Sequence, residues 1–224
     1  PPENTPLPST TVSQTTVPTS TSTPESSTPK TKTATTAAPS GQGIPPLTAG
    51  DEITLTQIAM INTTTGWGIG RQWQSDEHIL RTSDGGQTWV DISPPEPPPQ
   101  EGGPKKLAWG HFADTEHAWV IYAYEDWSIV PQSPRVWVTS DGGESWLAGQ
   151  ELDLTGQEEF FTPEGFTFPD NQHGWLLIHI GGGMHHDYSL LYRTSDSGLT
   201  WQRLIDPYKE GLQSLGNTGL AFVD

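Results

Sequence analysis

Three aspartates recur in near-identical surroundings, and they are the first candidates for chemistry. They lie in the strings TSDGGQTW, TSDGGESW and TSDSGLTW. Carboxylates can act as general acids, bases or nucleophiles, but no enzyme needs one identical carboxylate in each of three repeats. An Asp in such a string can instead accept backbone N–H bonds in a tight turn, and the Gly permits positive φ. We therefore expect a structural role for Thr82, Asp84, Gly86, Thr88, Trp89, Thr139, Asp141, Gly143, Ser145, Trp146, Thr194, Asp196, Gly198, Thr200 and Trp201.

A second candidate is the run HIGGGMHHDY, which holds the potential metal ligands His179, His185, His186 and Asp187. Side chains alternate sides along a strand, so His185 and His186 are poorly placed to chelate one ion together. The chain has no Cys, so it can form no disulfide and has no thiolate ligand or thiol nucleophile. We predict no metal, no cofactor and no catalytic residue.

The strings belong to a longer repeat. Each is preceded by a Trp, at positions 67, 119 and 175, and seven residues earlier by Met60, Phe112 or Phe168. An Asn or Asp follows two residues after that position. The segment LAFVD restarts the series at Phe222. The sequence therefore contains three repeats of about 55 residues and the opening of a fourth.

Each repeat reads as four short strands. The segments KLAWGHF, AWVIYAY, PRVWVTS and SWLAG in the second repeat are rich in β-branched and aromatic residues, and Gly and Pro separate them. Repeated four-stranded antiparallel sheets favour an all-β fold, a β-propeller, over an open sandwich. We expect blades at about 50–93, 104–149 and 163–206, with the next beginning at 216–224. Three blades cannot close a ring, so we expect a fragment of a six- to eight-bladed propeller.

The N-terminal segment has a different composition. Of its first 40 residues, 28 are Pro, Thr or Ser, and no aromatic residue precedes Trp67. Such a segment cannot bury enough apolar surface to fold alone. We predict a disordered Thr/Ser/Pro-rich linker or stalk over residues 1–46 and the partial propeller over 47–224. A stalk of this kind, in a chain that opens on Pro1, is typical of a secreted, periplasmic or surface-tethered protein whose upstream signal or lipid anchor has been removed.

Charge and hydropathy limit the classes of partner that the chain can bind. The net charge is −17, and 25 of the 27 acidic residues follow the N-terminal segment, against eight of the ten basic ones. Such a surface repels phosphate backbones, which argues against nucleic acid as a partner. No run of 18 apolar residues is present, so the sequence predicts no direct membrane span.

The three strings and the whole-repeat shape F-x-D…GW…ILRTSDGGQTW resemble the Asp-box (bacterial neuraminidase repeat) β-propellers. The resemblance covers about Gly50 to the C-terminus and is strongest to the photosystem II stability and assembly factor family and its bacterial relatives. Sialidases, xyloglucan-cleaving glycosidases and sortilin-type receptors share the box. In these families the box lies away from the ligand face, which agrees with a structural role.

The resemblance leaves two classes of function open. A sialidase would need an arginine triad. The chain has five Arg, and two of them, Arg81 and Arg193, occupy the same repeat position directly before the box, so they belong to the repeat. A xyloglucanase-like site would need two suitably separated carboxylates, which this acidic sequence could supply. We predict a non-catalytic binding or assembly scaffold, with a glycoside hydrolase as the alternative.

The strand topology indicates which end of the sheets would bind a ligand. In a four-stranded meander the second-to-third loops lie at the end opposite the boxes, and we place them at about 71–77, 125–134 and 181–187. They contain the predicted ligand-binding residues Trp73, Glu125, Asp126, Trp127, His185, His186 and Asp187. Exposed aromatics beside carboxylates suit a protein or carbohydrate ligand, although Trp73 and Trp127 could instead cover their own blades. Pro94–Pro99 could offer a polyproline segment to a partner or form a stiff connection between blades.

Overall fold

The computed structural model describes residues 44–156, 160–183 and 186–205, and every regular element in these ranges is a β-strand. The predicted opening of a fourth repeat, 216–224, lies outside the described residues, as does nearly all of the predicted linker. Ile44, three residues before the predicted domain boundary, is already buried, and its N–H donates to the carbonyl of Glu96 at 2.9 Å.

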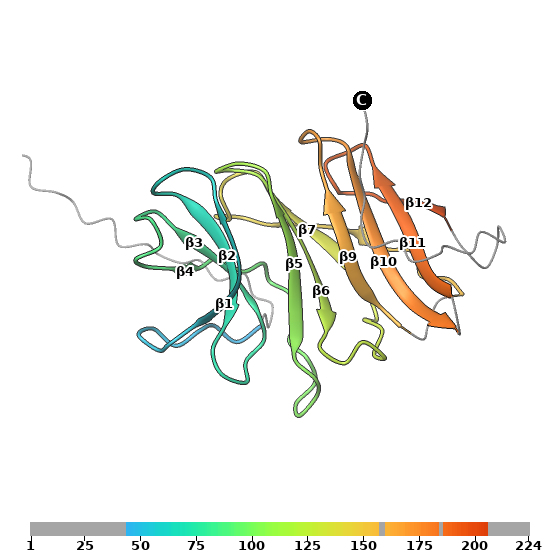
Figure 1. Cartoon of the computed structure of the whole chain (residues 1–224), viewed down its shortest axis with the longest axis horizontal. Coiled ribbons are helices and arrows are strands. Elements are labelled where there is room, and N and C mark those ends of the chain that lie inside the picture. Colours follow the sequence, from blue (N-terminus) through green and yellow to red (C-terminus); the bar gives the residue numbers. More distant parts are fainter. Residues whose placement is uncertain (1–43, 157–159, 184–185, 206–224) are drawn as a thin grey trace, which may run out of the picture. The chain divides into compact units, whose positions relative to one another are not determined.

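Twelve strands form three separate four-stranded sheets, each an antiparallel meander in sequence order (Figure 1). The first blade contains β1 (Thr54–Met60), β2 (Gly66–Arg71), β3 (His78–Thr82) and β4 (Val90–Asp91). The second contains β5 (Lys106–Phe112), β6 (Ala118–Tyr124), β7 (Arg135–Thr139) and β8 (Leu147–Glu151). The third contains β9 (Thr162–Thr167), β10 (Gly174–Gly183), β11 (His186–Thr194) and β12 (Gln202–Ile205).

The strand sequences explain this arrangement. Strand β6 (AWVIYAY) is almost entirely buried because a sheet covers each of its faces, and it therefore reads as a continuous apolar run. In β5, which pairs with β6 along its whole length, Lys106 lies opposite Tyr124 and Phe112 opposite Ala118. Strand β5 contacts β2 of the first blade, and β9 contacts β5 and β6 of the second. The sheets therefore stack face to face in sequence order, which is the blade arrangement of a β-propeller.

Two hydrophobic cores lie between successive blades. Trp67, Ile69 and Ile79 of the first blade pack with Val120 and Tyr122 of the second. The second core joins residues of β6 and β7 to residues of β10 and β11, including Trp119, Ile121, Leu176, Ile178 and Tyr192. Because each core needs two blades, no blade can bury its apolar face alone.

Candidate functional site

The repeated box forms the β3–β4, β7–β8 and β11–β12 turns, with the same hydrogen bonds each time. In the first turn Asp84 Oδ1 accepts the N–H of Thr88 at 2.9 Å, and Asp84 Oδ2 accepts its hydroxyl at 2.6 Å. The Thr82 hydroxyl donates to Asp84 Oδ1 at 2.9 Å and accepts the N–H of Gly86, whose φ is +87°. Asp141 and Asp196 repeat this pattern. Every carboxylate oxygen of the three box aspartates thus accepts a hydrogen bond from within its own turn.

The boxes share one end of each sheet with the β1–β2, β5–β6 and β9–β10 turns. Gly85 N–H donates to Thr64 O at 2.8 Å, and equivalent bonds join Gly142 to Glu116 and Ser197 to Gln172. We call this end the lower rim. The Asn or Asp of each repeat caps these turns: Asn62 Oδ1 accepts the N–H groups of Thr64 and Thr65. Asp114 and Asp170 accept the equivalent N–H groups in the second and third repeats. Sequence reasoning found these positions by their spacing but assigned them no role.

The opposite end, the upper rim, holds the second-to-third loops and the connections between blades. The loop after β6 is bonded to the first interblade connection, since Glu125 N–H donates to Lys105 O at 2.7 Å. The third loop is shorter than the predicted 181–187, because β10 runs to Gly183 and β11 begins at His186. His186 and Asp187 therefore belong to a strand, and His185 lies outside the described residues. This hairpin extends because Gly182 and Gly183 pair with Asp187 and His186 after a register shift.

The two predicted tryptophans are both on the surface of the upper rim. Trp73 is 90% exposed and lines a hollow of about 570 Å³ with Arg71, Lys105 and Glu125. Trp127 is 59% exposed, and its ring stacks on Phe160 of the connection to the third blade at 4.8 Å between centroids. Trp127 therefore leans toward the next blade rather than over its own.

The predicted acids flank Trp127. The Asp126 side chain accepts the hydroxyl of Ser128 at 2.6 Å and its N–H at 3.1 Å, and these two hydrogen bonds lower the pKa of Asp126. Glu125 Oε1 lies 3.9 Å from Arg71 Nη1 of the first blade. The structure thus brings Trp73, Glu125, Asp126 and Trp127 to one rim, on loops of two neighbouring blades.

A larger groove, of about 630 Å³, opens on the same rim between the first interblade connection and the 125–134 loop. Sequence reasoning missed it, although it noted the proline run that forms one wall. Its lining is rich in proline and aliphatic side chains, with two aromatic rings and a few polar groups: Pro95, Glu96, Pro97, Pro98, Gln100, Gly103, Pro104, Lys106, Tyr124, Ile129, Val130, Pro131, Gln132, Ser133, Arg135 and Trp137.

A nearly buried ion pair closes part of this groove. Lys106 Nζ binds Glu96 Oε1 and donates to the carbonyl of Pro97 at 2.6 Å, while Trp137 Nε1 donates to Glu96 Oε2 at 2.7 Å. The Lys106 side chain is only 8% exposed. Because both carboxylate oxygens are engaged, Glu96 holds the proline segment against the second blade instead of offering a free carboxylate.

Two adjacent buried acids form hydrogen bonds between the first blade and the second. Asp76 Oδ1 accepts the N–H of Lys106 at 2.9 Å, and Glu77 Oε2 accepts the N–H of Ala108 at 2.8 Å. Glu77 Oε1 also accepts the hydroxyl of Thr56 at 2.7 Å. These side chains satisfy N–H groups on β5, and no repeated pattern marked them in advance.

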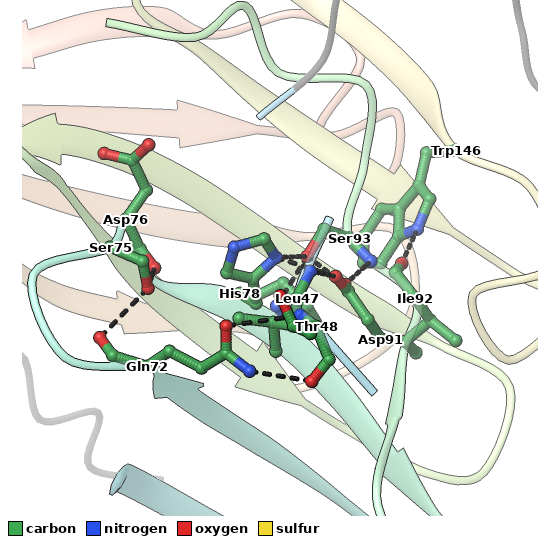
Figure 2. A network of polar contacts seen from close by, with 11 residues as sticks. Leu47, Thr48, Gln72, Ser75, Asp76, His78, Asp91, Ile92, Ser93 and Trp146 are labelled. Carbon is green, nitrogen blue, oxygen red and sulfur yellow. Dashed lines mark hydrogen bonds and ion pairs between the residues drawn. The ribbon is translucent and has the colours of Figure 1, made fainter. Parts of the chain in front are cut away.

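A serine, a histidine and an aspartate meet beside these acids (Figure 2). His78 is 1% exposed, and its Nδ1 lies 2.8 Å from Asp91 Oδ2 and 3.3 Å from Ser93 Oγ. Burial disfavours the charged form of Asp91, but hydrogen bonds from His78 and Ser93 and the charge of His78 outweigh it and lower the pKa of Asp91.

This cluster is not a nucleophilic triad. A triad places the hydroxyl on one ring nitrogen and the carboxylate on the other, whereas Ser93 and Asp91 both contact Nδ1 and His78 Nε2 is buried without a partner. Ser93 Oγ instead donates to Asp91 Oδ1 at 2.7 Å and accepts the N–H of Ile79. Figure 2 shows the His78, Asp91 and Ser93 side chains converging. Since His78 and Ile79 lie on β3 and Asp91 ends β4, these contacts tie the end of β4 to β3.

Within the described ranges, no group of three or more His, Asp or Glu side chains is placed to hold a metal ion. The same part of the chain contains no helix with the length and apolar character needed to cross a membrane.

No protein-family model matches the chain, and no curated protein matches it. Among solved structures it is similar to one described as YCF48 bound to D1 peptide, with 21% sequence identity and a TM-score of 0.44. The alignment covers 76% of this chain and 47% of that one, so this chain spans about half the length of that structure. The propeller assignment rests on the three stacked sheets themselves.

Proposed function

We propose that the chain is a binding scaffold that takes an extended peptide segment of a partner protein on its upper rim. The observation that carries the proposal is the groove of about 630 Å³ between the proline connection and the 125–134 loop. Proline, aliphatic and aromatic side chains share its lining with polar groups, a mixture that could hold both the side chains and the backbone of a peptide. Both walls are loops that the sheets hold in place, so the groove needs little reorganisation to bind.

The carboxylates around the rim favour binding over glycoside hydrolysis. Three acids that line hollows on this rim each face a basic side chain: Glu96 faces Lys106, Glu125 faces Arg71, and Glu151 faces Arg135. A glycosidase needs a protonated acid and a second carboxylate on either side of the scissile bond. Each of these three carboxylates is instead engaged by a basic side chain, which keeps it from flanking a glycosidic bond.

The family and the location are part of the same proposal. The hydrogen-bonded turns at Asp84, Asp141 and Asp196 support membership of the Asp-box propellers. A scaffold of the assembly-factor kind fits a rim that offers a groove and exposed aromatics. The Thr/Ser/Pro-rich N-terminal segment supports a location outside the cytoplasm, tethered at a surface.

A displayed library of random linear peptides, selected on the 224-residue chain, tests this function. Ile129 lines the groove and is 37% exposed, so Ile129→Glu should keep the fold and weaken selected peptides by about tenfold or more. Leu147→Glu is the matched control, because Leu147 is an exposed aliphatic residue on β8 that does not line the groove. Peptides that bind both variants equally, or a library that yields no binder, would refute the proposal.

A further inference from the structure

The upper rim carries two stacked aromatic rings, which we call the Trp127–Phe160 platform. The Phe160 ring rests on Gly181. A Cβ built at Gly181 would lie 2.5 Å from Phe160 Cδ2, so the Phe160 ring lies directly against the backbone of β10. Trp127 stacks on Phe160 with 28° between the ring planes. The carbonyl of Trp127 also accepts the N–H of Phe161 at 3.2 Å. The Trp127 loop is therefore supported by the connection to the third blade and, through Phe160, by β10 of that blade.

This construction leaves a large part of a tryptophan ring in solvent. Trp127 remains 59% exposed although one side of its ring is supported by Phe160. A supported aromatic ring is costly to expose and loses little conformational entropy when it binds, which is why such rings dominate recognition surfaces.

Charge identifies what the platform would take. Glu125 and Asp126 immediately precede the ring, and hydrogen bonds from Ser128 lower the pKa of Asp126, so its carboxylate stays ionised at neutral pH. The chain as a whole carries a net charge of −17. An aromatic face beside carboxylates, in a strongly negative field, attracts cations and repels anions.

The fold already uses this pairing internally. The guanidinium of Arg81 lies over the Trp67 ring at 4.3 Å, and that of Arg193 lies over Trp175 at 5.7 Å. Both distances lie within the range of a cation–π interaction, so tryptophan rings of this chain already hold guanidinium groups.

We propose that the Trp127–Phe160 platform binds a cationic side chain, arginine or lysine, of the partner peptide, with Asp126 as its counter-charge. This inference rests on the proposed peptide-binding function and adds the chemical class of the ligand. The cation would lie over the exposed part of the Trp127 ring, which Asp126 directly precedes in the sequence.

The test uses a blocked glycine–serine heptapeptide with one central arginine, titrated into the isotope-labelled 224-residue chain. The Trp127 indole N–H signal, assigned by its loss in Trp127→Phe, reports binding. We expect the arginine peptide to bind roughly three- to tenfold more tightly than the same peptide with citrulline, which keeps the shape and removes the charge. The advantage should shrink as salt rises, because the carboxylates are exposed.

Variants separate the platform from general acidity. Trp127→Ala, followed by the backbone amide signals of the 125–134 loop because it lacks the indole reporter, should weaken the arginine peptide by about tenfold. Asp126→Asn should weaken it without abolishing the ring contact. Leu147→Ala, which removes an exposed apolar side chain on β8, should leave the affinity unchanged. Melting temperatures of all three variants confirm that the fold is intact.

Three results would overturn the inference. Equal affinity for the arginine and citrulline peptides would show that the platform does not select a cation. A shift of the Trp127 signal with cellohexaose but not with arginine would show a carbohydrate site instead. Library peptides that depend on Ile129 but not on Trp127 would leave the proposed function standing and remove only the cationic subsite.

Discussion

Trp119 of the second blade stacks on Phe168 at the end of the first strand of the third, with ring centroids 3.9 Å apart and 13° between the planes. One repeat earlier, Trp67 stacks on Phe112 with 5.3 Å between centroids. The indole N–H groups reach across as well, since Trp67 donates to Asp114 O and Trp119 to Ser197 O, each at 2.8 Å. The repeated aromatics thus form contacts between successive blades.

Removal of one ring from this stack should destabilise the protein strongly. Phe168 is buried, and Phe168→Ala should lower the free energy of unfolding by about 3–5 kcal/mol because it leaves a cavity between two blades. Denaturant unfolding measures the change, with Leu147→Ala as the exposed control. A loss below about 1 kcal/mol would mean that the blades hold together without the stack.

The box aspartates should affect stability and leave ligand binding unchanged. Asp141→Ala removes the acceptor for the N–H and hydroxyl of Ser145 and for Thr139 Oγ1, which should cost about 1–3 kcal/mol. Glu144→Ala, at a variable and exposed position of the same turn, should cost little. An Asp141→Ala protein that melts normally but fails to bind library peptides would reveal a functional carboxylate.

The first box should also stabilise the fold in a way that is lost in acid. Hydrogen bonds from the side chain and backbone of Thr88 lower the pKa of Asp84 from 3.8 to about 2. A lowered folded-state pKa means that the stabilisation is complete above about pH 4 and is lost as the pH falls toward 2. The melting-temperature advantage of the native chain over Asp84→Asn should therefore narrow across this range. A constant difference would show that the charge contributes nothing.

The buried acid Glu77 should be required for the junction between the first two blades. Glu77→Ala leaves the buried N–H of Ala108 without its acceptor, so the free energy of unfolding should fall by about 1–3 kcal/mol. Faster amide exchange at Ala108 would locate the effect. Glu77→Gln keeps an acceptor oxygen and should lose less, whereas equal losses would indicate that the charge itself matters.

The sequence alone determined the repeating parts of this protein. Strands β5 and β6 coincide with the predicted segments KLAWGHF and AWVIYAY, because alternating or continuous apolar runs are local patterns with a known period. The three box turns are equally local: Thr82, Asp84 and Thr88 make their hydrogen bonds within seven residues of one another. A pattern that is repeated three times at near-constant spacing leaves few other folds.

Only the tertiary structure decided what happens between the repeats. Glu77 meets Ala108, Glu96 meets Trp137, and Trp127 meets Phe160, and each of these pairs is more than 30 residues apart and occurs once. Contacts of this kind leave no period in the sequence, since the stacking of blades and not the local chain brings the partners together. The groove and the aromatic platform arise at such contacts, so the upper rim could be located from topology while its binding surface required the packed blades.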